Sequence, residues 1–538
     1  MRNNHDRCYG ERKMLFLRVP RGLALIFVVL TFVTVYYCYL RLEVHPKLHE
    51  AKVVIPPNAD VIVEPEWLSD GVLRKPTKSV EKAVYSSTSP HIEPSATLKV
   101  EEHVSTAPSS ELSVSSTDIL LIVKTGASTV WRRMPMQLLT TLSNLPNSVI
   151  YSDFQENLSH EIQTVDILSN VSDTLRIYDT TAYGIYQNLQ TNIHAYREQA
   201  QLPGDEPEQA ELPSGGKPGW SLDRYKFLPM LEHAQKNFPG FKWTVYIEDD
   251  TFVFWTNLLQ WLATLSADNE PSYYGATAGE GNATFAQGGA GIVFSRSLMK
   301  SVFGGPKCPT LQEYANFTSN SCCGDMILGK VLRDHNVIID RGEHYDPVSF
   351  GTEPPWKTWF QDFSWCKPIF TFHHLHQRDL IQLAMLERKH NQSNLGSQRP
   401  ITFRDIFLAI ISPYLKDRRD NWDNFASRHK LTKDITTITN PPWGPPSPVV
   451  QDTSALKQAY TSPEACLAAC VALSSCRIWR HEIDNEKQKS CSLDIVVILG
   501  RQMEGQASWD KRVINSGWMM DRINDSLMKD KCEIAVPP

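Results

Sequence analysis

Short apolar runs alternate with polar segments through the middle of the chain. DILLIVKT (residues 118–125) and WTVYI (243–247) are rich in β-branched and aromatic residues and predict buried strands. NSVIYSDFQE (147–156) and DTLRIYDT (173–180) repeat the pattern of a strand followed by polar residues. Since helical spacing fills the segments between these runs, strand and helix alternate, and we predict an α/β domain.

Three segments carry the apolar spacing of helices. WRRMPMQLLTTL (131–142) predicts a helix that is interrupted or begins near Pro135, and SLDRYKFLPMLEHAQKNF (221–238) predicts an amphipathic helix. In TFVFWTNLLQWL (251–262) the apolar spacing leads into a third helix. The stretch 201–219 is rich in Pro, Gly and acids and predicts a loop.

The strand at 243–247 leads directly into three acids, Glu248, Asp249 and Asp250. An isolated acidic triplet is most often a solvated turn. Here strongly apolar segments on both sides leave little room for a free surface loop, and the carboxyl ends of strands are where open α/β sheets bind ligands. We therefore predict a functional site at this triplet.

Three later features also lie beside apolar segments. QGGAG (287–291) precedes a strand, and its glycines permit close approach of the backbone to a ligand, with a tight turn as the alternative. Asp325 precedes a helical pattern, where helix capping is the simplest interpretation. A candidate group of metal ligands follows another strand and consists of His373, His374 and His376. Zinc is disfavoured because no C-x-x-C or H-E-x-x-H pattern accompanies them.

The N-terminal part predicts a membrane anchor. Residues 22–40 carry no charge, and at about 1.5 Å per residue they nearly span a bilayer core of about 30 Å. No small-residue cleavage site follows, which favours an anchor over a signal peptide. Basic residues are concentrated in 1–21, so the positive-inside rule predicts a type II protein with a cytosolic tail. Residues 41–117, rich in Ser, Thr and Pro, predict a disordered stem.

The C-terminal part predicts a second domain. NPPWGPPSP (440–448) contains five prolines and marks a boundary after a domain over 118–440. The segment 449–538 predicts a small disulfide-rich domain with five cysteines, namely Cys466, Cys470, Cys476, Cys491 and Cys532. Their connectivity does not follow from the sequence, and one cysteine is left over, to pair elsewhere or stay free.

Length and charge add few constraints. A chain of 538 residues has room for about two or three domains. A net charge of -6 and the lack of a basic block argue against a nucleic-acid partner. Six glycosylation sequons agree with a lumenal body and begin at Asn157, Asn170, Asn282, Asn316, Asn391 and Asn524.

Taken in order, five stretches resemble the fringe-like β-glycosyltransferases of family 31, over roughly 118–440. They are DILLIVKT, WTVYIEDDTFV, FAQGGAGIVFSR, CCGDMILGKVL and FTFHHL. In the family these correspond to an opening VKT strand, a DDD-type metal motif, a GGAG segment, a [DE]D helix start and an FH strand. The long loop and SLDRYKFLPM are most similar to the fungal branch, and the C-terminal cysteine spacing resembles a PAN/apple module. Two positions depart from the family pattern. Glu248 stands where the family usually has Asp, and Gly324 stands where an acid, [DE], often precedes the catalytic Asp.

The resemblance implies a GT-A (Rossmann-like nucleotide-sugar) domain in the Golgi membrane. It would transfer a hexosyl or N-acetylhexosaminyl unit from a UDP-sugar to a hydroxyl of a glycan or glycoprotein, with inversion to a β-linkage. Asp250 and His373 would hold manganese, with His374 as the alternative ligand. Glu248 and Asp249 would help to hold the cation or the donor ribose.

The remaining roles also follow from the resemblance. Lys124 and Thr125 would line the nucleotide side of the site, and Asp325 would be the base that accepts the proton of the acceptor hydroxyl. The acceptor would approach along Gly288, Gly289 and Ala290.

Two other classes of function are also compatible with the sequence. A glycoside hydrolase needs two separated carboxylates and no metal, and Asp250 and Asp325 offer such a pair. A catalytically weak membrane protein that binds glycan or protein through the PAN-like tail is the other alternative. Dependence on manganese and UDP distinguishes the transferase from both. The sequence leaves the donor sugar, the acceptor and the oligomeric state undetermined.

Overall fold

The computed structural model describes residues 114–143, 145–193, 218–279, 281–393, 399–436, 438, 454–503 and 510–532. The predicted membrane anchor, almost all of the stem and the proline-rich boundary at 440–448 lie outside these residues. Among the helices that are described, none combines the length and the apolar character needed to cross a bilayer.

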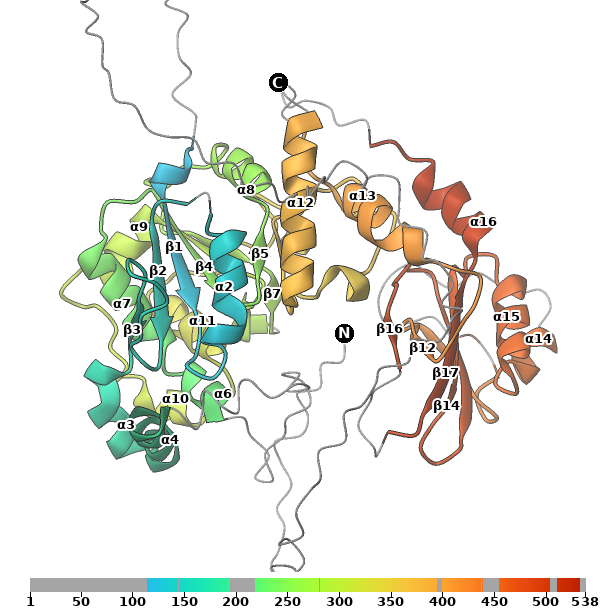
Figure 1. Ribbon diagram of the computed structural model, residues 1–538, viewed down its shortest axis with the longest axis horizontal. Coiled ribbons are helices and arrows are strands. Elements are labelled where there is room, and N and C mark those ends of the chain that lie inside the picture. The colour runs from blue at the N-terminus through green and yellow to red at the C-terminus, as the bar shows by residue number, and fades with distance from the viewer. Residues whose placement is uncertain are drawn as a thin grey trace, which may run out of the picture. The chain divides into compact units, whose positions relative to one another are not determined.

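A mixed six-stranded sheet forms the centre of the first domain, in the order β3-β2-β1-β4-β9-β6 (Figure 1). The strands β3, β2, β1 and β4 are mutually parallel, and β9 runs antiparallel to its neighbours β4 and β6. The bounds are β1 Ile119–Lys124, β2 Ser148–Ser152, β3 Thr164–Asp166, β4 Trp243–Glu248, β6 Tyr273–Gly275 and β9 Ile292–Ser295. The predicted α/β class is confirmed.

Helices cover both faces of this sheet, which explains why its strands are apolar along their whole length. Successive side chains of β1 point to opposite faces, so Leu120 and Ile122 join one core and Leu121 and Val123 join the other. The first core contains side chains of α4 (Thr180–Thr191), α7 (Phe227–Asn237) and α11 (Gly324–Asp334). The second contains side chains of α2 (Val130–Leu139) and α8 (Trp255–Leu262).

Three local predictions are wrong. DTLRIYDT forms helix α3 (Ser172–Tyr178) and not a strand, because the position beside β2 is occupied by the three-residue strand β3. Only Leu175 of α3 is buried, whereas Ile177 and Tyr178 are exposed. In α2 the helix begins at Val130 and continues through Pro135, so the proline lies inside it. The stretch 221–238 is divided between α6 (Pro218–Asp223) and α7.

A second, antiparallel sheet of five strands forms the C-terminal region, in the order β11-β17-β14-β15-β13. The bounds are β11 Arg419–Asp420, β13 His429–Leu431, β14 Ile478–Ile483, β15 Lys489–Asp494 and β17 Val513–Trp518. Helix α15 (Pro463–Ala472) packs on it and carries two cysteines of the disulfides Cys466–Cys491 and Cys470–Cys476. Strands from both sides of 440–448 therefore share one sheet.

One hydrophobic core joins this sheet to the first domain. In β14, Ile478 packs into a core that includes Phe252 and Phe372, while the neighbouring Trp479 packs beneath α15. A bridge pairs Phe360 with Val497. The fifth cysteine, Cys532, forms a disulfide with Cys366, so the partner of the cysteine left over lies outside the cysteine-rich segment.

The other elements are short, apart from α12 (Gln377–Ser393). They are η2 Ser116–Asp118, η3 Ser169–Val171, β5 Phe252–Val253, β7 Thr277–Ala278, η4 Gly281–Ala283, β8 Phe285–Ala286, α9 Arg296–Leu298, η5 Met299–Phe303, α10 Ala315–Ser319, η6 Pro347–Ser349, η7 Pro355–Lys357, β10 Thr371–Phe372, α13 Phe403–Ile406, η8 Phe407–Ile411, η9 Ser412–Tyr414, β12 Trp422–Asp423, α14 Ser454–Gln458, β16 Arg501–Gln502, α16 Met520–Ile523 and η10 Asn524–Met528.

Candidate active site

The acidic triplet lies where two parallel strands of the central sheet end. β1 and β4 pair in a register that sets Lys124 opposite Glu248. The chain then turns through Asp250 into β5, whose Phe252 pairs with Phe372 of β10. Because β10 ends at Phe372, the histidines that follow it lie beside this turn.

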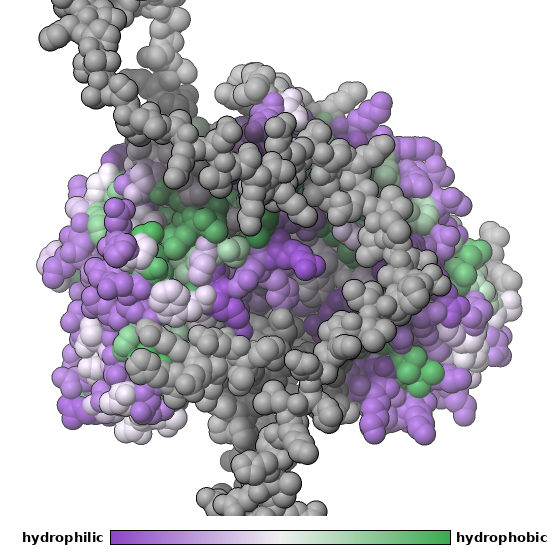
Figure 2. Space-filling model, viewed as in Figure 1, coloured by the Kyte–Doolittle hydropathy of each residue, from purple (hydrophilic) through white to green (hydrophobic). Residues whose placement is uncertain are grey.

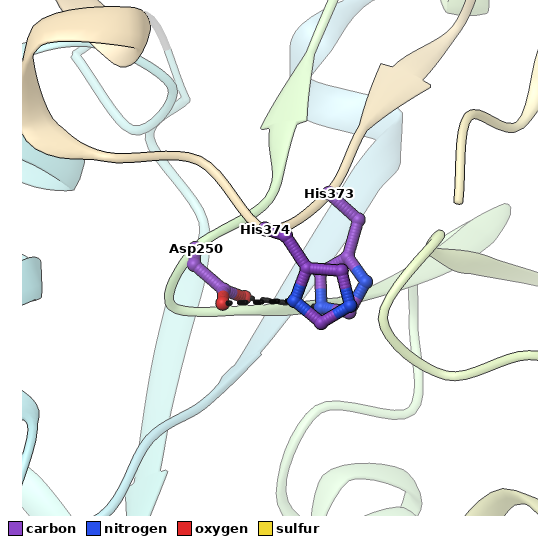
Figure 3. A group of neighbouring side chains, drawn as sticks. All are labelled: Asp250, His373 and His374. Atoms are coloured by element: carbon purple, nitrogen blue, oxygen red, sulfur yellow. Dashed lines mark ion pairs between the residues drawn. The ribbon is translucent and has the colours of Figure 1, made fainter. Parts of the chain in front are cut away.

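Asp250, His373 and His374 bring their candidate ligand atoms within 4.8 Å of one another. Nε2 of His373 lies 3.2 Å from Oδ1 of Asp250, and Nδ1 of His374 lies 4.0 Å from Oδ2. The two imidazoles stack with their centroids 3.8 Å apart and face the carboxylate (Figure 3). His374 has a φ of 58°, in the left-handed region that is uncommon for residues other than glycine. The third predicted histidine, His376, is exposed and is not part of this group.

One buried atom of this group, Nδ1 of His373, has no hydrogen-bond partner within the described residues, whereas Oδ1 of Asp250 is paired with Nε2 of the same imidazole. Buried polar atoms in native proteins are almost always bonded, so this atom is available to a bound ligand. One carboxylate and two imidazoles form a donor set that suits a transition metal such as manganese better than calcium. The residues therefore fit a divalent cation.

A continuous chain of alternating charges runs through the site. Successive members lie 2.6–3.8 Å apart, in the order Asp153, Lys226, Asp223, Lys124, Glu248, His373, Asp250, Arg133 and Asp249. Its five carboxylates face three permanently charged cations, which leaves two negative charges when the imidazole is neutral. A divalent cation would balance this excess charge.

Neighbouring charges control the ionisation of Asp250, Glu248 and His373 in this chain of charges. Burial opposes the charge of Asp250, but Arg133 and His373 outweigh it and hold the pKa of Asp250 well below its usual range. Lys124 does the same for Glu248, again against the effect of burial. Burial by itself would lower the pKa of His373, yet Asp250 and Glu248 raise it to about 10. Without a cation, the imidazole is therefore protonated at neutral pH and neutralises part of the excess charge.

Asp249 has a different environment from its neighbour Asp250. Its carboxylate accepts hydrogen bonds from the hydroxyls of Thr125 (2.6 Å) and Thr129 (2.7 Å) and from Arg133 (2.6 Å). Both of its oxygens are thus bonded within the protein, and its side chain is buried. In this structure Asp249 ties helix α2 to the end of β4, and Thr125 contacts that carboxylate.

Lys124 is likewise enclosed by the protein. Its Nζ lies 3.0 Å from Asp223 and 3.0 Å from Glu248, and its side chain is buried. Behind it, the fully buried Lys226 contacts Asp153 at 2.9 Å and Asp223 at 2.8 Å. These lysines fix the position of the Glu248 carboxylate.

The proposed base lies on the other side of Glu248. Asp325, the second residue of α11, accepts a hydrogen bond from the backbone N–H of Gly288 at 2.9 Å and from that of Met326 at 2.8 Å. Burial raises the pKa of Asp325, and the charge of Glu248 adds to this effect. The N-cap of α11 is Cys323, so Asp325 links its helix to the glycine segment and does not cap it.

The segment from Gly288 to Ala290 separates the cation side from the base side. A Cβ on Gly289 would collide with the His373 imidazole, and one on Gly288 would lie 3.4 Å from Oε1 of Glu248 and 3.5 Å from Cβ of Asp325. The carbonyl of Ala290 accepts a hydrogen bond of 2.6 Å from the Thr371 hydroxyl. Glycine is needed here because the backbone itself packs against the site.

Sequence reasoning missed four members of the charge chain, Asp153, Lys226, Asp223 and Arg133. Asp153 follows the apolar run of β2, which is the same strand-then-acid signal that identified the acidic triplet. Asp223 ends α6 and Lys226 directly precedes α7, and neither position carries such a signal. Their role becomes visible only when the ends of β1, β2 and β4 meet.

A family model described as fringe-like matches residues 114–340. This segment includes the acidic triplet, the glycine segment and Asp325, and it supports a glycosyltransferase of the fringe-like family. His373 and His374 and the C-terminal sheet lie beyond the matched residues. No curated protein matches the sequence.

Proposed function

We propose that this protein is an inverting, UDP-sugar-dependent glycosyltransferase with a GT-A domain of the fringe-like type. It would transfer a hexosyl or N-acetylhexosaminyl unit to a hydroxyl of a glycan or glycoprotein acceptor and form a β-linkage. The observation that carries the proposal is the convergence of Asp250, His373 and His374, with one buried imidazole nitrogen unpartnered among the described residues, in a cluster with two excess negative charges when His373 is neutral. The fringe-like match over the same strands supports it.

Asp250 and His373 would hold the cation, and His374 is placed to join them. Bound there, a divalent cation such as manganese would offset the negative charge that develops on the leaving diphosphate. Glu248 lies between the cation side and Asp325, where Lys124 holds it at 3.0 Å. It is therefore placed to contact the donor, whereas the bonded oxygens of Asp249 leave that residue a supporting role.

Asp325 would accept the proton of the acceptor hydroxyl as the bond to the anomeric carbon forms. Its Oδ2 is fixed by the N–H of Gly288, so the carboxylate is oriented before the acceptor binds. The raised pKa brings it closer to the operating pH, which is where a general base is most efficient. The acceptor would approach along the glycine segment.

We also propose that the predicted anchor at 22–40 places this domain in the Golgi lumen as a type II membrane protein. The uncharged span and the basic residues before it support this topology. The three disulfides agree with folding in an oxidising compartment.

The decisive experiment measures UDP release by the full chain, purified from eukaryotic cells, against a panel of UDP-sugars with and without manganese. We expect turnover of at least one UDP-sugar that requires the cation. Asp250→Ala should abolish this turnover and the manganese-dependent binding of UDP. Asp173→Ala is the matched control, because its carboxylate is exposed and its ion pair with Arg176 is on the surface.

Cation-independent binding of UDP in calorimetry, equal in the wild type and in Asp250→Ala, would contradict the assignment. Hydrolysis of a glycan without UDP would instead support the glycosidase alternative.

A further inference from the structure

A cavity of about 490 Å³ lies between α2, α8 and α12, apart from the candidate active site. Its apolar wall is formed by side chains that include Leu139, Phe252, Trp255 and Leu259. On the face drawn in Figure 2, hydrophobic side chains gather where these helices meet in Figure 1. The volume is in the usual range of small-molecule sites, roughly 300–1,000 Å³.

Polar groups also line this cavity. Thr141 is 1% exposed, and its hydroxyl has no hydrogen-bond partner within the described residues. Glu387 lines the cavity and accepts a hydrogen bond of 3.1 Å from the N–H of Thr256. Burial raises the pKa of Glu387 to about 7. The cavity thus combines an apolar wall with polar groups that can form hydrogen bonds.

A glycosylation sequon lies at the mouth of the cavity. Asn391 lines it and donates a hydrogen bond of 2.8 Å from Nδ2 to the Thr256 hydroxyl. Asn391, Gln392 and Ser393 are all exposed at the end of α12 and form the sequence Asn-Gln-Ser. The nitrogen that would carry a glycan is therefore held beside a lining residue of the cavity.

We propose that Asn391 is N-glycosylated and that the first sugar of its glycan occupies this cavity. The attached N-acetylglucosamine matches the lining, because its acetyl methyl suits the apolar wall and its amide and hydroxyl groups suit polar lining residues such as Glu387. The disulfides place folding in a compartment where sequons are modified. The inference does not depend on the proposed transferase activity.

The first test uses the full chain expressed in eukaryotic cells. Mass spectrometry should find a glycan on Asn391. A peptide:N-glycanase, applied to the native protein, should release this glycan at least 10-fold more slowly than after denaturation, because the linkage is covered. The glycan at the exposed Asn524, on η10, should show no such protection. An unmodified Asn391, or equal release in the native and denatured states, would overturn the proposal.

The second test changes the cavity without changing the sequon. Ala384 lines the cavity from α12, and Ala384→Leu would fill part of it. The glycan should still be attached but should lose its protection in the native state. Ser393→Ala, which removes the glycan and keeps Asn391, should lower Tm by a few degrees, whereas Asn524→Gln should leave it unchanged. Protection that persists in Ala384→Leu would show that the sugar is covered elsewhere and would refute this site.

Discussion

Two stretches of one charge chain differ in how completely their charges are paired. In the paired stretch, Lys226 lies between Asp153 and Asp223 at 2.8–2.9 Å and is fully buried. In the open stretch, Asp250 and His373 face each other at 3.2 Å, but Nδ1 of His373 is buried without a hydrogen-bond partner among the described residues. Both stretches lie at the carboxyl ends of the same strands.

The difference separates structural charges from functional ones. A buried ion pair with all of its partners holds backbone segments in place, but it leaves no bonding capacity for a ligand. A buried group that lacks a partner is costly, and it persists where a ligand completes it. The paired stretch therefore positions Lys124 and Glu248, while the open stretch is available for the cation. The following changes test this division, in decreasing order of their expected effect.

Lys226→Met should have the largest effect on stability. It leaves Asp153 and Asp223 without their shared cation, and breaking a buried pair in this way costs about 3–5 kcal/mol. Denaturant unfolding should show this loss, or the variant should fail to be secreted. Lys330→Met is the control, because its pair with Asp334 is on the surface and is worth less than about 1 kcal/mol. Equal stability of the two variants would contradict the structural role of the paired stretch.

Asp325→Asn should reduce the rate of transfer by about 10²- to 10⁴-fold, because it removes the proton acceptor. The amide oxygen can still accept the hydrogen bond from Gly288, so the fold and UDP binding in manganese should stay unchanged. Transfer assays and calorimetry measure the two effects separately. Asp334→Asn, at the exposed end of the same helix, serves as the control. Normal transfer by Asp325→Asn would leave the residue a purely structural link.

Manganese should stabilise the wild type and not Asp250→Ala. At about 100 times its Kd, a ligand that binds only the folded state adds about 2.7 kcal/mol to the free energy of unfolding. A thermal melt with and without the cation should therefore show a shift that chelation reverses. A shift of the same size in Asp250→Ala would move the cation site elsewhere.

The smallest effect on stability is expected at Glu387. Among the described residues, its buried carboxyl differs from those of the charge chain because no cation pairs with it. Burial raises its pKa from about 4.5 to about 7 in the folded state. The protonated form thus contributes stability that is fully present below about pH 4.5 and is lost as the pH rises through about 7. Glu387→Gln keeps an acceptor for Thr256 and removes this loss.

The free energy of unfolding of the variant should therefore exceed that of the wild type by about 1–2 kcal/mol at pH 8 and by little at pH 4.5. The difference is smaller than the full pKa shift implies, because the side chain is partly exposed. Unfolding at several pH values measures the difference, and Glu353→Gln, which pairs with Lys357 on the surface, is the control. A gain that is independent of pH would show that Glu387 does not titrate in this range.

The sequence predicts the apolar strands β1, β2 and β4 and the place of the acidic triplet, because a buried parallel strand needs a continuous apolar run and its polar end is visible in the pattern. It also pointed to Asp325 and to the histidines after β10. These features depend on neighbours along the chain.

The three-dimensional structure was needed for every feature that depends on partners distant in sequence. It bonds the oxygens of Asp249 to Thr125 and Arg133 but sets Asp250 beside His373, although the two acids are adjacent. It placed α3 where a strand was expected, since β3 already pairs with β2. It shows that Cys532 forms a disulfide with Cys366, 166 residues earlier. It also shows that strands from both sides of the proline-rich segment pair in one sheet. Local periodicity carries no information about which partner occupies a position, because that choice is made when the segments pack.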